Sequence, residues 1–265
     1  MNQYDRRKLL SKVTALAKLA GDEIMKSFRD QFEIFHKRDS SPVTNADRAS
    51  EKIIVEGLRK LTPNFPVIAE EEVASGRKVK VSTEAFWLVD PLDGTKEFIK
   101  KNNEFTVNIA LLKENQPIFG VVFAPALDIL YWGCENKGSY RSNIKNSYNS
   151  ISVNSQLSDP VQIAGSRSHP SIKMNAFTSQ FEKYEVKPMG SSLKICLVAD
   201  GSVHFYPRLG PTMEWDTAAA HAVLRAAEGE MMKYGTNEPL EYNKRNLLNP
   251  EFIAGNMHNI QSLKR

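Results

Sequence analysis

The chain has 265 residues, of which 35 are Lys or Arg and 31 are Asp or Glu, so its formal net charge is +4. Hydrophobic residues make up 41% and charged residues 25%, which is typical of a globular protein and excludes a disordered or collagen-like polymer. The length allows one large domain or two closely packed ones. Two cysteines, Cys134 and Cys196, are too few for a disulfide framework and favour a reducing compartment.

The N-terminus and the apolar runs predict a cytoplasmic protein. The opening residues MNQYDRRKLLSKV lack the apolar core of a signal peptide. No apolar run approaches the ~18–20 residues of a membrane span. Positive charge is dispersed, and this net charge is a weak signal for polyanion binding, so no nucleic-acid partner is predicted. Peripheral contact with the inner membrane and the oligomeric state stay open.

The first part of the chain predicts two helices and a short strand. Residues 4–30 place apolar side chains at helical spacing, which predicts an amphipathic helix. A loop rich in Ser, Pro, Asn and Asp follows, and a second helix is expected near 46–60, capped by Asn45 or Asp47. The sequence PVIAEEE then predicts a short strand that leads into acidic residues. The polar loop after it, through about residue 83, is typical of a mobile flap.

The middle of the chain predicts an antiparallel sheet and the end an α/β arrangement. AFWLVD predicts a strand that ends at Pro91, and DGTKEFIK a turn entering a short helix. FTVNIALL, IFGVVFAP and ILYWGC predict an antiparallel meander. After a polar segment at 141–150, the strands VQIAG and EVKPMG alternate with helical patterns, and TAAAHAVLRAAEG predicts an Ala-rich helix. We therefore expect an α+β part at 1–150 and an α/β part at 151–265.

The strongest chemical signal is DPLDGT, residues 90–95, at the end of an apolar strand. Its carboxylates, Asp90 and Asp93, can converge on one point, with a backbone carbonyl between them. Such hard oxygen ligands suit Mg²⁺. Gly94 and Thr95 then open a helix, whose free N–H groups favour a phosphate beside the metal.

Each acidic feature also has an ordinary structural explanation. An isolated D-x-x-D-G usually forms only an Asx-type turn. The run Glu70-Glu71-Glu72 could be a solvated loop, and Asp216 could cap the Ala-rich helix. These explanations weaken when the features are considered together.

Taken together, these elements resemble the inositol monophosphatase superfamily. DPLDGT matches its signature D-P-[I/L]-D-G-T, and WDTAA at 215–219 is similar to its second signature, W-D-x-A-A. The order and separation of the two agree, with Glu70 and Glu71 upstream, and the resemblance spans about residues 40–230. It implies an α/β fold, a layered α/β/α/β/α sandwich with metals and phosphate at the junction of the two parts.

Four segments are similar to one branch of this superfamily, the 3′(2′),5′-bisphosphate nucleotidases. They are SSPVTNAD, WLVDPLDGTKEFI, EFTVNIAL and GSSLK. Enzymes of that branch convert adenosine 3′,5′-bisphosphate to AMP and phosphate. The resemblance therefore implies a phosphoric monoester hydrolase with a small phosphorylated nucleotide as substrate. An inositol or sugar phosphatase on the same scaffold is the alternative. A binding module that has lost catalysis would lack an acidic metal ligand, whereas Glu70, Asp90, Asp93 and Asp216 are all present.

The resemblance implies five metal ligands, which are Glu70, Asp90, the Leu92 carbonyl, Asp93 and Asp216. Two or three Mg²⁺ ions are expected, with Mn²⁺ as an alternative. Four clustered carboxylates make sense only if cations offset their repulsion. Two-metal chemistry would lower the pKa of the attacking water and stabilise the leaving oxygen.

The resemblance also implies catalytic roles for Asp47, Thr95 and Glu71. The Thr95 hydroxyl would contact the attacking water, Asp47 would take its proton, and Glu71 would assist. Asp47 could instead be only a helix cap. The acidic pair could also be Glu71-Glu72, although the strand that runs directly into Glu70 favours the earlier register.

Lys194 and Arg208 are the cations expected to hold the second phosphate, away from the metals. Each could also be an ordinary solvated surface residue. The full set of substrate contacts implied by the resemblance is Glu70, Leu92, Asp93, Gly94, Thr95, His169, Ser191, Lys194, Arg208 and Asp216.

Overall fold

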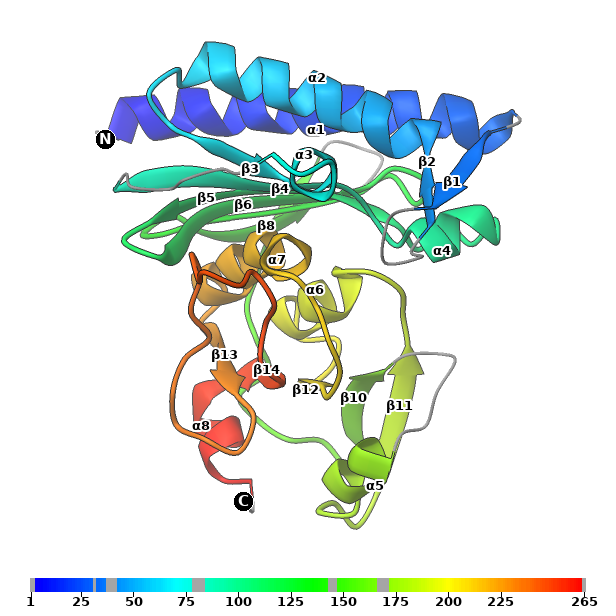
Figure 1. Cartoon of the computed structure of the whole chain (residues 1–265). Coiled ribbons are helices and arrows are strands. Elements are labelled where there is room, and N and C mark those ends of the chain that lie inside the picture. The colour runs from blue at the N-terminus through cyan, green and yellow to red at the C-terminus, as the bar shows by residue number, and fades with distance from the viewer. Residues whose placement is uncertain are drawn as a thin grey trace.

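The described residues form two large β-sheets and three layers of helices, stacked in the order helix, sheet, helix, sheet, helix (Figure 1). The computed structural model describes residues 3–30, 32–36, 42–77, 84–142, 147–165 and 172–263, with side chains from residue 8 onward. This is the layered α/β/α/β/α sandwich that the resemblance implies. The helices are α1 (Gln3–Arg29), α2 (Asn45–Leu61), α3 (Glu70–Ala74), α4 (Thr95–Ile99), α5 (Ile172–Thr178), α6 (Leu193–Ala199), α7 (Glu214–Ala226) and α8 (Met257–Gln261).

The strands form a seven-stranded sheet, a five-stranded sheet and a separate pair, β1 and β2. In the larger sheet, strands β3 to β9 lie in sequence order, and only β3 and β4 are parallel. The strands are β1 (Ile34–His36), β2 (Pro42–Thr44), β3 (Val67–Ala69), β4 (Ala85–Asp93), β5 (Thr106–Lys113), β6 (Gln116–Ala124), β7 (Ile129–Cys134), β8 (Gly138–Ser142), β9 (Tyr148–Ile151), β10 (Val161–Gly165), β11 (Tyr184–Pro188), β12 (Phe205–Arg208), β13 (Gly229–Lys233) and β14 (Phe252–Asn256).

Helices α1 and α2 lie side by side on the outer face of the larger sheet (Figure 1). Apolar side chains at helical spacing are buried along α1, which confirms the predicted amphipathic helix. The buried side chains of α1 are Leu9, Val13, Ala17, Ala20 and Ile24. The second predicted helix is α2.

Strand β4 is longer than predicted. It continues through Pro91 to Asp93, with a shift of register between Asp90 and Asp93. Proline cannot donate to a β-ladder, so the expectation of a strand end was reasonable, but a bulge tolerates proline because the ladder is interrupted there. The bulge therefore carries the whole acidic motif on one strand.

Helices α6 and α7 fill the layer between the two sheets (Figure 1). Helix α7, the predicted Ala-rich helix, packs against β6 and β7 at two glycines. A Cβ on Gly120 would lie 2.2 Å from the carbonyl oxygen of Ala219, so only glycine allows this approach. The close contact fixes the first turn of α7, which carries Asp216, against the larger sheet.

The smaller sheet has the strand order β11-β10-β12-β14-β13 and mixes parallel and antiparallel pairs. Side chains of α5 and α8 pack on it in a core of their own. The segment 141–150 was expected to be a polar connection, but its described residues include the end of β8 (141–142) and most of β9 (148–150), because strand pairing outweighs their polar composition. The chain changes sheets between Ile151 and Val161, and the division at residue 150 stays a prediction.

Among the described residues, no helix is both long enough and apolar enough to cross a bilayer.

Candidate active site

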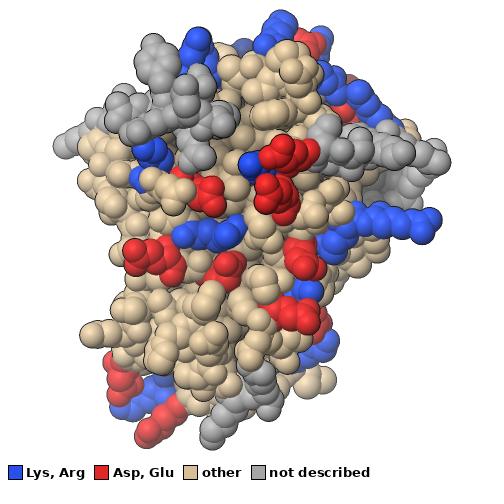
Figure 2. Space-filling model, turned by 90° about the vertical axis from the view of Figure 1, so that its left-hand side faces the viewer, with Lys and Arg blue, Asp and Glu red and all other residues tan. Residues whose placement is uncertain are grey.

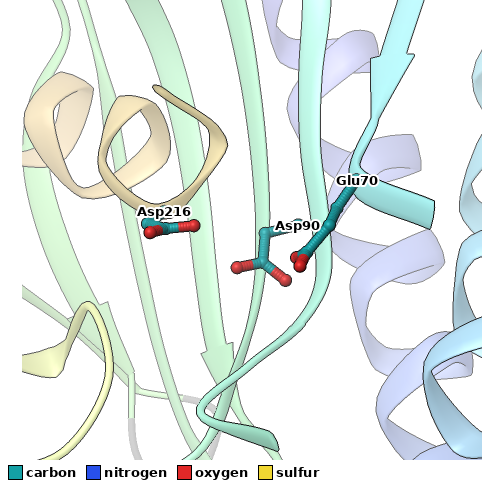
Figure 3. Close-up of side chains that lie close together, drawn as sticks. All are labelled: Glu70, Asp90 and Asp216. Atoms are coloured by element: carbon teal, nitrogen blue, oxygen red, sulfur yellow. The ribbon is translucent and has the colours of Figure 1, made fainter. Parts of the chain in front are cut away.

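Three carboxylates from three different elements meet between the two sheets. Glu70 begins α3 directly after β3, Asp90 lies in β4, and Asp216 lies in the first turn of α7 (Figure 3). One oxygen atom of each lies within 4.8 Å of the other two. The parallel register pairs Ala69 of β3 with Val89 of β4. The residues that follow these two, Glu70 and Asp90, are therefore neighbours.

Burial and mutual repulsion make this group costly when ionised. Burial raises the pKa of Asp90 well above its usual range, and the charges of Glu70, Asp93 and Asp216 raise it further. Burial likewise raises the pKa of Asp216, with Asp93 and Glu70 adding to the effect. An all-oxygen donor set with crowded negative charge fits a hard divalent cation, which would lower this cost.

Asp93 lies beside the three carboxylates and contacts the segment before α6. Its Oδ2 accepts hydrogen bonds from the Ser191 hydroxyl at 2.7 Å and the Ser192 N–H at 2.6 Å. Gly94 follows in the left-handed region, with φ of 92°, which turns the chain into α4. Asp93 therefore connects the end of β4 to Ser191, which the family resemblance predicts to be a substrate contact.

Asp47 and Thr95 are in contact, as the predicted proton-accepting pair requires. The Thr95 hydroxyl donates to Asp47 Oδ1 at 3.0 Å and lies 3.3 Å from the Leu92 carbonyl oxygen. Asp47 Oδ2 accepts from the N–H and the hydroxyl of Thr44, at 2.7 and 2.6 Å. The side chain of Asp47 is buried. The two carboxylate oxygens of Asp47 thus have different partners: Oδ2 bonds Thr44 and Oδ1 bonds Thr95.

The cap of α2 differs from the prediction. Thr44 is the N-cap, because its hydroxyl accepts the Ala46 N–H at 3.2 Å. Asp47 is the third residue of the helix and bonds back to Thr44, which completes a capping box. Neither Asn45 nor Asp47 is the cap, although Asp47 takes part in capping.

The three glutamates begin a short helix, α3, rather than a loop. Glu70 belongs to the carboxylate group, whereas Glu72 accepts from the Arg59 guanidinium at 2.9 Å and forms an ion pair with Arg77. This geometry favours the register that starts at Glu70. The predicted flap lies partly at residues 78–83, outside the described residues.

Two residues of α2 that the sequence analysis did not single out also contact this site. The Ser50 hydroxyl donates to the Pro91 carbonyl at 2.8 Å. The Glu51 carboxylate accepts the backbone N–H groups of Glu71 and Glu72. The positions of Ser50 and Glu51, three and four residues after Asp47, place them on the same helix face, and that spacing was the available signal.

A cavity of about 660 Å³ is lined by acidic residues, Asp93 and Asp216, and by basic residues, among them Lys194 and Arg208. Lys194 Nζ donates to the carbonyl oxygens of Ser191 at 2.7 Å and Met189 at 3.2 Å. Burial, aided by the charge of Arg208, lowers the pKa of Lys194 to about 8. Lys194 is thus buried, which excludes the other interpretation of its sequence, an ordinary solvated surface lysine.

Arg208 comes from the end of β12 and contacts the segment before α7. Its Nη2 donates to the Pro211 carbonyl at 2.6 Å, while its buried Nε has no hydrogen-bond partner in the described part of the chain. A buried donor of this kind is suited to an acceptor on a ligand. His169, the remaining predicted substrate contact, lies outside the described residues.

The cavity has further residues that the sequence analysis did not assign. Lys96 and Lys100 of the α4 segment and Tyr206 of β12 line it. Lys96 directly follows the DPLDGT motif and Lys100 lies four residues later, and this proximity was the available signal for them. On the face of the molecule in Figure 2, basic and acidic side chains are interspersed.

The sequence matches the model of the inositol monophosphatase family over residues 5–264. The chain belongs to the inositol monophosphatase family. It is 43% identical over 249 residues to the 3′(2′),5′-bisphosphate nucleotidase CysQ of Escherichia coli (strain K12), covering 92% of this chain and 98% of that protein. The CysQ protein of Haemophilus influenzae is 33% identical over 247 residues, covering 92% and 91%.

Solved structures of this family share the fold. CysQ from Bacteroides thetaiotaomicron superposes with a TM-score of 0.81 at 37% identity, covering 93% of this chain and 96% of that one. The inositol monophosphatase of Anabaena superposes with a TM-score of 0.74 at 26% identity, covering 96% and 94%.

Proposed function

We propose that this member of the inositol monophosphatase family is a Mg²⁺-dependent 3′(2′),5′-bisphosphate nucleotidase, which releases AMP and phosphate. The observation that carries the proposal is the cavity between Asp216 and Lys194, because it joins a carboxylate group to a buried cation. The name of the CysQ relatives supplies the substrate class. We place the enzyme in the cytoplasm, which suits its two buried free thiols.

The metal ligands in this proposal are Glu70, Asp90, the Leu92 carbonyl, Asp93 and Asp216. The donor set consists of oxygen atoms alone, which favours Mg²⁺, with Mn²⁺ as the substitute. Two or three ions would lower the pKa of the attacking water and offset the charge of the leaving oxygen. In the protein itself, the bonds from Ser191 and Ser192 orient the Asp93 carboxylate.

The proton of the attacking water passes to the pair Thr95 and Asp47 in this proposal. The Thr95 hydroxyl already donates to Asp47 Oδ1, so it is oriented to accept a hydrogen bond from water with its lone pairs. Thr44 holds the other oxygen of Asp47 with two bonds, which keeps the carboxylate in one orientation. Glu71 would assist from the start of α3.

The substrate is held at two places in this proposal. Its scissile phosphate would lie at the carboxylate group, next to Gly94 and Thr95. Its second phosphate would lie near Lys194 and the unpartnered Nε of Arg208. Ser191 contacts Asp93 and so lies between the two places, and His169 is assigned to the second place by the family resemblance alone.

Phosphate release by the purified chain tests the proposal. Adenosine 3′,5′-bisphosphate and inositol 1-phosphate would be compared at equal concentration with Mg²⁺, with EDTA as the control. We expect a strong preference for the nucleotide and no release in EDTA. A preference for inositol 1-phosphate would keep the metal site and overturn the substrate, whereas full activity in EDTA would overturn the metal.

A further inference from the structure

Helix α3 begins without a capping side chain at its N-cap position. The first N–H groups of any helix lack partners within the helix. Residue Ala69 occupies the N-cap position of α3 and has no side chain that can accept a hydrogen bond. The acceptor comes instead from α2, about twenty residues earlier in the chain.

The Glu51 carboxylate is that acceptor. Its Oε2 accepts the Glu71 N–H at 2.7 Å, and its Oε1 accepts the Glu72 N–H at 2.9 Å. Only 6% of Glu51 is exposed. Both oxygens are therefore used by backbone donors, and such bonds are strongest when the carboxylate is ionised.

The peptide group held in this way adjoins Glu70. The N–H of Glu71 belongs to the same planar unit as the carbonyl of Glu70, so the bond to Glu51 restrains the backbone from which the Glu70 side chain extends toward Asp90 and Asp216 (Figure 3). Glu51 is not part of the three-carboxylate group itself.

We propose that Glu51 is a positioning residue, which holds the start of α3 so that Glu70 and Glu71 face the metal site. The inference rests on the proposed metal-dependent function and names a residue that acts through the backbone. Helix α2 then forms a frame for three segments of the site. Asp47 contacts Thr95, Ser50 holds the Pro91 carbonyl, and Glu51 holds α3.

The position of Glu51 is costly for stability, which argues against a role in folding alone. Burial, with the charges of Glu71 and Glu72, raises the pKa of Glu51 to about 7, although the two backbone hydrogen bonds partly offset this rise. An apolar residue would avoid the cost of burying a carboxylate but would leave the N–H groups of Glu71 and Glu72 without this acceptor. A buried carboxylate at this position is easier to understand if its two bonds serve the neighbouring site.

The test compares Glu51→Gln and Glu51→Ala with Glu56→Gln, a matched control at an exposed position of the same helix. The first measurement is amide hydrogen exchange in the metal-free full chain. We expect faster exchange at Glu71 and Glu72 in both Glu51 variants and no change in the control. Glutamine keeps one acceptor oxygen and nearly the same volume, so Glu51→Gln carries the test if the alanine variant does not fold.

The second measurement is Mg²⁺ affinity by titration calorimetry, which does not depend on any substrate. Losing an outer partner of a metal ligand weakens metal binding about 10–100-fold, so we expect the dissociation constant to rise at least about tenfold in Glu51→Ala and less in Glu51→Gln. In the phosphatase assay the Mg²⁺ concentration for half-maximal rate should rise likewise, with KM for the nucleotide unchanged.

Two results would overturn the inference. Unchanged exchange at Glu71 and Glu72 would show that the two bonds do not hold α3. Faster exchange with a Mg²⁺ affinity within about twofold of the parent chain would show that Glu51 only caps a helix. If instead the affinities change as expected but the parent chain releases no phosphate from the nucleotide, the proposed substrate fails and the positioning role stands.

Discussion

The two walls of the cavity are built in opposite ways. The acidic wall is the carboxylate group of Glu70, Asp90 and Asp216, which reaches the cavity through Asp216, beside Asp93. Burial and crowding raise the pKa of Asp90 and of Asp216. Lys194 and Arg208 form a basic wall, and each of these cations is held by backbone carbonyls. The acidic wall is unfavourable on its own, whereas backbone carbonyls hold both cations of the basic wall and leave the buried Nε of Arg208, which has no partner among the described residues, free for a ligand.

This difference assigns different tasks to the walls. A group of carboxylates that repel one another gains most from a divalent cation, so the acidic wall is suited to the chemical step. A restrained cation pair is suited to recognition, because little reorganisation is needed when an anion arrives. We therefore expect changes in the acidic wall to affect turnover and changes in the basic wall to affect the choice of substrate.

Asp90→Asn should give the largest effect and separate activity from stability. We expect the rate of phosphate release to fall at least about a hundredfold. Losing an outer partner of a metal ligand already lowers activity by about 10–100-fold, and losing the ligand itself should cost at least as much. The metal-free protein should become more stable by about 1 kcal/mol, roughly 2–4 °C, because a neutral amide ends the repulsion. Activity assays and thermal unfolding in EDTA measure both. Lower stability in EDTA would contradict the account of a strained acidic wall.

The pH dependence of stability should differ between metal-free and Mg²⁺-loaded protein. A carboxyl whose folded pKa is raised binds its proton more tightly in the folded state, so it adds stability as pH falls. Glu51, with a pKa of about 7 in the folded protein against an ordinary 4.5, adds stability as the pH falls from about 7 toward 4.5. The raised pKa values of Asp90 and Asp216 act in the same direction. In EDTA, the free energy of unfolding should rise by at least about 2 kcal/mol from pH 7.5 to pH 5, the contribution expected from Glu51 alone. Denaturant titrations measure it, and a fall over this range would count against the raised pKa values.

Lys194→Ala should change substrate choice more than turnover. We expect KM for adenosine 3′,5′-bisphosphate to rise about tenfold, the loss of one charged hydrogen-bonding partner. KM for a simple monophosphate should change much less. Because Lys194 also holds the carbonyls of Met189 and Ser191, equal rises for both substrates would mean that it shapes the segment before α6 without contacting the second phosphate.

A smaller effect is expected from pH on the same lysine. The lowered pKa of about 8 means that Lys194 is charged below pH 8 and neutral above it. KM for the bisphosphate should therefore rise several-fold between pH 7 and pH 9, and the rise should be absent in Lys194→Ala. Steady-state kinetics at a series of pH values measures it, and an identical profile in the two proteins would exclude this titration as the cause.

Much of the acidic wall could be predicted from sequence, because its information is local. Asp90 and Asp93 stand in one short motif, and WDTAA marks Asp216 at the start of a regular Ala-rich helix. The layered fold followed from the resemblance that these motifs carry, and it is confirmed by the structure and its neighbours.

The remaining contacts could not be predicted because they depend on tertiary pairing. Glu51 meets the Glu71 N–H across 20 residues, and Asp93 meets Ser192 across 99. Pro91 lies inside a strand only because a bulge interrupts the ladder. The burial of Lys194 depends on packing between α6 and both sheets, and composition does not distinguish such a lysine from a solvated one.

The division of tasks between the two walls is tested most directly by one comparison in the unmodified protein. The value of kcat/KM would be measured at saturating Mg²⁺ for adenosine 3′,5′-bisphosphate and for adenosine 3′-monophosphate, which share the scissile phosphate and differ only in the second one. The account predicts at least about tenfold preference for the bisphosphate, the contribution of one charged pair. Equal values would show that the basic wall does not bind the second phosphate and would contradict the account.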